Sequence, residues 1–204
     1  MNWVGRHIRT LISAACLAAG SAASIACGFE DPNSASMARG ALNLAYPHAL
    51  YVTSAVWRAQ MEGVIDRNEL SAPAKALGGY QKVARLLGTI RDLLAAPLDG
   101  RGAPAFSMVL IGPMLWTHYE PADDGLKMTV HTDAPSNGDV IIVTDEPVIA
   151  ALIEGRITPR SAEDLGLIRF YGAPDRVQQV TSWFGRLSAP ENNATLDTAQ
   201  QTSH

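Results

Sequence analysis

The chain of 204 residues has few cysteines and no excess of positive charge. Its two cysteines, Cys16 and Cys27, are too few for a disulfide framework or a four-cysteine zinc site. The 16 Lys and Arg residues are outnumbered by 20 Asp and Glu residues, which gives a net charge of −4. A general nucleic-acid binder needs clustered positive charge to contact phosphates. We therefore expect no nucleic-acid partner.

The sequence also lacks the common catalytic motifs. It contains no Gly-x-Ser-x-Gly elbow, His-Glu-x-x-His pair, phosphate-binding loop or dinucleotide-binding fingerprint. His118 and His131 fall in neighbouring predicted strands, and a loop at 121–125 would pair His118 with Met128. His131 would then lie about 10 Å away along the strand, too far to share a metal. We predict no enzyme, no metal site and no cofactor, with both histidines at the surface.

The first 26 residues have the pattern of a secretory signal peptide. Arg6 and Arg9 give a positive start, and the run from Leu11 to Ala26 is apolar or small. A membrane-spanning helix needs about 20 predominantly apolar residues, and this run is shorter. We therefore predict that residues 1–26 are removed. The mature chain would be periplasmic, or attached to a membrane on its periplasmic side.

Cys27 would then be the first mature residue and the only mature cysteine. The segment Ser24-Ile25-Ala26-Cys27 resembles a bacterial lipobox, although Leu is usual where Ser24 stands. Lipidation would tether the chain to a membrane without spanning it. The alternative is a free thiol near the N-terminus. The sequence leaves both interpretations open.

The mature chain changes its hydrophobic period near Pro104. Apolar residues before this point recur at helical steps of three and four, and those after it alternate as in strands. Later Pro and Gly residues separate two helices, a strand and a last helix. We divide the chain into a signal peptide, an N-terminal helical extension, a folded domain and a disordered tail, at 1–26, 27–70, 71–187 and 188–204.

The order of these elements predicts an α+β fold. We expect a five-stranded, mainly antiparallel sheet covered on one face by helices, because an amphipathic helix must bury its apolar side against another element. Short links between the first four strands predict that they pair as a meander. Val140 to Thr144 is apolar on both faces, which is typical of an interior strand.

The second half resembles the SCP2-like (sterol carrier protein 2) lipid-transfer domain family over roughly residues 74–187. Asp139 to Glu146 reads as an apolar strand that leads into an acidic helix start. Ala150 to Gly155 resembles the family's Leu-rich helix, and Arg156 to Ala162 its short helix with a proline. Leu165 to Gly172 resembles a strand between two glycines.

The resemblance implies an apolar tunnel between the sheet and the helices that holds a lipid or another hydrophobic molecule. Such a tunnel would be lined by Met108, Leu110, Trp116, Met128, Leu152, Phe170, Val180 and Phe184. The same side chains would otherwise fill a closed core. The first function that we predict is therefore non-catalytic binding or carriage of a hydrophobic ligand. The alternative is an accessory module that docks a protein partner through residues 31–66.

Overall fold

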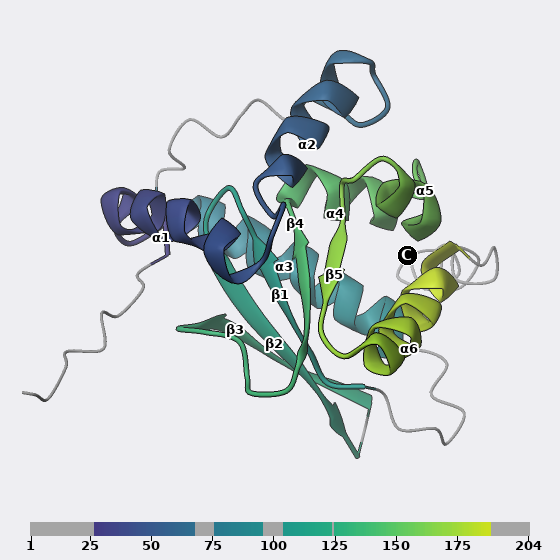
Figure 1. The fold of residues 1–204 in the computed structure, drawn as a ribbon. Coiled ribbons are helices and arrows are strands. Elements are labelled where there is room, and N and C mark those ends of the chain that lie inside the picture. The colour runs from purple at the N-terminus through teal and green to yellow at the C-terminus, as the bar shows by residue number, and fades with distance from the viewer. Residues whose placement is uncertain (1–26, 68–75, 96–103, 124, 189–204) are drawn as a thin grey trace, which may run out of the picture.

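The computed structural model describes residues 27–67, 76–95, 104–123 and 125–188 (Figure 1). The predicted signal peptide, and the predicted tail from residue 189 onward, lie outside the described residues. Within the described residues, helices come first, followed by four strands, two helices, one strand and a last helix, in the order that the periodicity predicts. They are α1 (Pro32–Ala45), α2 (Tyr51–Met61), α3 (Ala76–Ala95), β1 (Phe106–Leu110), β2 (Leu115–Ala122), β3 (Gly125–Thr132), β4 (Val140–Thr144), α4 (Glu146–Ile153), α5 (Pro159–Asp164), β5 (Arg169–Tyr171), α6 (Pro174–Phe184) and a final 3₁₀ turn, Gly185–Ser188.

The fold is α+β, with five strands in one mixed sheet of order β3-β2-β1-β4-β5. β1, β2 and β3 form an antiparallel meander, but β4 leaves it and pairs with β1 in parallel. The predicted four-stranded meander is therefore wrong. Because β4 is buried on both faces, it takes an interior place between β1 and β5 and not the edge beside β3.

The β2–β3 hairpin is tighter than the sequence predicts. Ala122 pairs with Gly125, so both strands extend into the predicted loop at 121–125, and Gly125 takes a φ of +128°, which favours glycine. The register consequently shifts by one residue, and His118 pairs with Thr129 instead of Met128. Such a shift changes which side chains share a face of the sheet. The predicted pairing of His118 with Met128 is therefore wrong.

One face of the sheet packs against α3 and α6. Phe106 stacks on Tyr119 at a ring-centroid distance of 4.5 Å and meets Phe184 of α6 edge-on at 5.7 Å. The Tyr119 hydroxyl donates to the carbonyl of Leu87 in α3 at 3.3 Å. Burial raises the pKa of this phenol far above its ordinary value, so it remains a neutral donor. These contacts place the largest aromatic side chains in the core.

The opposite face is covered in part by the segment that contains α1 and α2, whereas Lys127 and Thr129 of β3 are exposed. The ring of Tyr46 lies 6.1 Å from Trp116 and 5.3 Å from Tyr171, and the Tyr171 hydroxyl donates to the Pro47 carbonyl. The guanidinium of Arg39 donates to the carbonyls of residues 111 and 112 after β1. The expectation of helices on one face only is therefore wrong, because β1 and β4 are apolar on both faces.

α1 and α5 each begin at a capping residue whose side chain forms a hydrogen bond. Asp31 accepts the backbone N–H of Asn33 ahead of α1, and Thr158 forms a capping box with Ser161 at α5. Pro32 and Pro159 each follow the cap, where a missing N–H costs nothing. No helix among the described residues has the length and apolar character needed to cross a membrane.

Burial of α4 gives a stability prediction at Leu152, which is 3% exposed. We expect Leu152→Ala to lower the free energy of unfolding by about 2–5 kcal/mol, because it removes buried methyl groups and leaves a cavity. Leu165→Ala is the matched control, since Leu165 is 47% exposed. It should change stability by less than about 0.5 kcal/mol in urea denaturation. Equal effects of the two substitutions would contradict this packing of α4.

Candidate functional site

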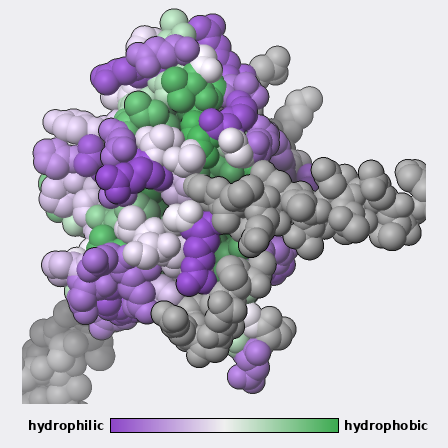
Figure 2. Space-filling view, turned by 90° about the vertical axis from the view of Figure 1, so that its right-hand side faces the viewer, coloured by the Kyte–Doolittle hydropathy of each residue, from purple (hydrophilic) through white to green (hydrophobic). Residues whose placement is uncertain are grey.

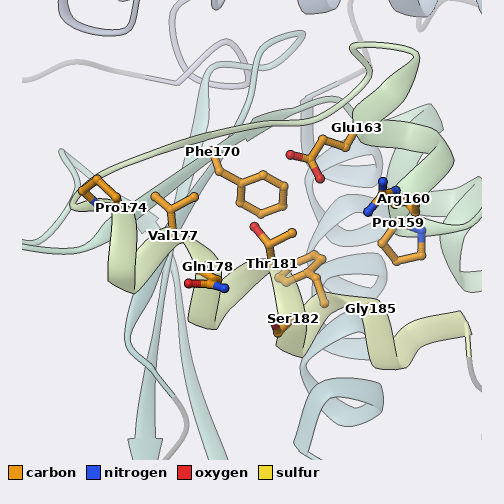
Figure 3. A pocket seen from close by; sticks show the side chains of 11 residues that line it. Pro159, Arg160, Glu163, Phe170, Pro174, Val177, Gln178, Thr181, Ser182 and Gly185 are labelled. Carbon is orange, nitrogen blue, oxygen red and sulfur yellow. The ribbon is translucent and has the colours of Figure 1, made fainter.

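A groove between α5, β5 and α6 has the size of a ligand site, with a volume of about 490 Å³ (Figure 3). Small-molecule pockets typically measure about 300–1,000 Å³. In the close-up, the ring of Phe170 lies at the centre of the groove between residues of α5 and α6. The lining consists of Pro159, Arg160, Glu163, Phe170, Pro174, Val177, Gln178, Thr181, Ser182, Phe184 and Gly185.

The groove has an apolar floor and a polar edge. Phe170 and Phe184 meet edge-on at 6.0 Å, and Val177 adds a branched side chain from α6. Arg160 and Glu163 project from α5, where Arg160 also lies 3.8 Å from Asp164 in an exposed ion pair. Exposed pairs of this kind contribute little free energy and are easily exchanged. The arrangement can therefore bury an apolar chain and offer a cation to a polar head.

The structure divides the eight predicted lining residues among different environments. Phe170 and Phe184 line the groove. Met108, Leu110, Leu152 and Val180 are buried in the core, and Met128 lies partly buried against it, near Gly88 of α3. Trp116 pairs with Val109, on the face opposite Met108, and packs on Tyr46. The eight residues therefore do not line one continuous surface, because the sheet separates Trp116 from the others.

The groove residues on α5 were missed by the sequence interpretation. Val177 lies in α6, and the apolar residues of that helix do not by themselves indicate which flank faces α5. Pro159 and Arg160 sit in a short helix whose position depends on contacts made far along the chain. The sequence offers one signal for this site. A short helix that begins with Pro159 directly precedes β5, the strand that contains Phe170 and Tyr171.

Figure 2 views the molecule from the side on which α6 lies. Hydrophobic residues reach this surface in patches that are separated by hydrophilic residues. Six large hydrophobic side chains are exposed among the described residues, and five of them belong to α1 and α2. The five are Met37, Leu44, Tyr51, Trp57 and Met61. Within the part of the chain that the structure describes, the predicted partner segment, 31–66, therefore carries five of the six exposed large hydrophobic side chains.

A partly buried polar cluster joins β1, β2 and the residue before β4. The Ser107 hydroxyl donates to Oδ2 of Asp139 at 2.5 Å, and Nδ1 of His118 lies 2.8 Å from the same oxygen. Nε2 of His118 faces Glu120 at 3.7 Å. In a nucleophilic triad the serine hydroxyl would bond the histidine nitrogen that the carboxylate does not contact. Here the serine proton goes to Asp139, so the cluster has the geometry of a structural network.

Comparison of this chain with models of known families, with curated proteins and with solved structures gives no match. The resemblance to SCP2-like domains therefore stays a prediction from the sequence.

The neighbouring residues Val180 and Thr181 of α6 test the position of the groove. Val180 is fully buried, whereas Thr181 lines the groove. We expect Val180→Trp to lower the free energy of unfolding by about 1–3 kcal/mol, because the core has no space for the larger ring. Thr181→Trp, the matched control, should leave thermal unfolding nearly unchanged. The reverse order of melting temperatures would show that α6 presents a different face to the sheet.

Proposed function

We propose that this chain is an exported, non-catalytic protein that binds a hydrophobic or amphipathic small molecule, such as a lipid, in the groove between α5 and α6. The observation that carries the proposal is the groove itself, with Phe170, Val177 and Phe184 as its apolar surface. Burying apolar ligand surface contributes about 25 cal/mol per Å² before the costs of binding. No catalytic residue is needed for this activity.

The polar edge favours a ligand with one polar end. Arg160 offers a guanidinium that can pair with a carboxylate or phosphate, and Gln178 and Thr181 supply neutral hydrogen-bonding groups. Glu163 lies at the same edge and would repel a second negative charge. A singly charged acyl chain fits this combination of groups. An apolar tail would lie against Phe170, and its head would face α5.

Export rests on the sequence of the first 26 residues, with their basic start and apolar run. We propose a location in the periplasm or on the periplasmic side of a membrane. A tunnel between the sheet and the helices, as the SCP2-like resemblance implies, would require the core to open, because Met108, Leu110 and Val180, which would line it, are each fully buried.

Filling the groove is the direct test of ligand binding. We expect Thr181→Trp to weaken binding of a fluorescent acyl probe at least about tenfold, which corresponds to about 1.4 kcal/mol. The added ring would occupy the space beside Phe170 and exclude the acyl chain. Fluorescence titration of the purified chain with the probe measures the change.

Thr53→Trp is the matched control, because Thr53 is exposed on α2 and lies outside the groove. It should bind the probe as the parent chain does. A parent chain that does not bind the probe would reject the proposal. Equal binding by the two tryptophan variants would move the ligand away from the groove.

A second candidate function is an accessory module for a protein partner, and the exposed side chains of α1 and α2 favour it. Met37 and Leu44 are seven residues apart, which places them on one face of α1, and Leu44 is 88% exposed. Leu42, on another side of the same helix, is buried in the core. α1 is therefore apolar both toward the sheet and toward solvent.

A photo-crosslinking residue at position 44 tests this second function in living cells. We expect one adduct of defined mass from position 44 and none from position 81, where Gln81 is exposed on α3. Introducing Met37→Glu should remove the adduct, because a charge on the same face would be buried without a partner. Identical patterns from both positions would show only random collisions and reject the module.

A further inference from the structure

Three side chains that can ligate a metal meet near the start of α1. The thiol of Cys27, a carboxylate oxygen of Glu30 and a ring nitrogen of His131 all lie within 4.8 Å of one another. Nε2 of His131 is 3.5 Å from Oε2 of Glu30. Cys27 is buried, at 2% exposure, whereas the side chain of Glu30 is 58% exposed. The cluster therefore has one buried anchor and an open side.

A tight turn before α1 places Cys27 and Glu30 together. The backbone N–H groups of Glu30 and Asp31 both donate to the Cys27 carbonyl, at 2.9 and 3.0 Å. Gly28 donates to the Pro113 carbonyl at 2.7 Å, which fixes the turn against the loop between β1 and β2. A Cβ atom at position 28 would lie only 3.1 Å from that carbonyl oxygen, so a glycine permits the close approach.

His131 reaches the cluster through a β-bulge. Thr117 pairs with Val130 and Trp116 pairs with Thr132, so His131 is an extra residue that has no partner in β2. Its φ of +64° lies in the left-handed region, which is uncommon for residues other than glycine but which histidine adopts more often than most. Bulges re-aim side chains, and this one turns the imidazole toward the turn before α1. Tyr80 of α3 contacts the imidazole edge-on at 6.4 Å.

The chemistry of the three groups points to zinc. Zn²⁺ prefers thiolate, imidazole and carboxylate ligands in a tetrahedral arrangement. Bond lengths of about 2.0–2.1 Å to nitrogen and oxygen put two tetrahedral ligand atoms about 3.4 Å apart. The 3.5 Å between His131 and Glu30 already matches this separation. A thiolate and a carboxylate also neutralise the charge of the ion.

We propose that Cys27, Glu30 and His131 bind Zn²⁺, with a fourth position open to water. Three protein ligands and one open position are typical of zinc sites that exchange a bound molecule. The site is independent of the groove, which lies between α5 and α6. It also excludes the lipid tether at Cys27, because the thioether of a lipidated cysteine provides no thiolate for the metal.

Calorimetric titration with Zn²⁺, on the chain purified from cells after export, tests the site. We expect one equivalent to bind, and Cys27→Ser, Glu30→Gln and His131→Asn each to weaken the affinity at least about tenfold, since loss of a second-shell partner alone costs about 10–100-fold. Replacing Zn²⁺ with Co²⁺ should give a thiolate-to-metal charge-transfer band that Cys27→Ser abolishes. Mg²⁺ should not compete, because it prefers oxygen ligands.

His48→Asn is the matched control for His131→Asn. Both histidines have a positive φ, of 67° and 64°, and asparagine tolerates that conformation at both positions. The control should retain full affinity. If another variant fails to fold, Glu30→Gln still tests the site, because Glu30 is exposed and its substitution should not affect folding. Absence of Zn²⁺ binding, undiminished binding by His131→Asn, or a diacylglycerol mass on the Cys27 peptide would each overturn the proposal.

Discussion

Burial of β1 and β4 on both faces is the constraint on which the rest of the fold depends. All five residues of each strand are buried, and the two strands pair in parallel at the centre of the sheet. Because neither face of these strands tolerates water, the chain must cover both. α3 and α6 cover one face, and the segment from α1 to α2 covers the other through Tyr46. The N-terminal extension therefore contributes to the same hydrophobic core as the rest of the chain.

The same constraint decides where a ligand can bind. Val180 and Phe184 of α6 pack inward against the sheet and form part of the core. Only the side of α6 that does not pack in the core is available to a ligand. This side lies next to β5, an edge strand of three residues. Phe170 of β5 is only partly buried there, which leaves an aromatic surface between α5 and α6. The candidate site is thus a groove at one edge of the sheet, where apolar surface remains uncovered.

The histidines of β2 and β3 have different surroundings because one extra residue interrupts the pairing of these two strands. His118 has a direct partner in β3, its side chain is 14% exposed, and it bonds Asp139 within a partly buried network that also contains Ser107. His131 is the unpaired residue of the bulge and faces the turn before α1. Both residues look alike in the alternating pattern of their strands. Their chemistry differs because one lies inside the hydrogen-bonded ladder and the other is turned out of it.

Local physics determined the type and order of the elements. Periodicity marks the helices and strands, and Asp31, Thr158 and their following prolines mark helix starts, because these signals depend on residues only a few positions apart. The tertiary structure alone decided that β4 joins β1, that Ala122 pairs with Gly125, and that Thr181 faces the groove while Val180 faces the core. It also brought Cys27 and Glu30 to His131, about 100 residues away in the sequence. Each of these outcomes depends on contacts between segments that are distant in the sequence. The residue pattern of one segment alone does not predict such contacts.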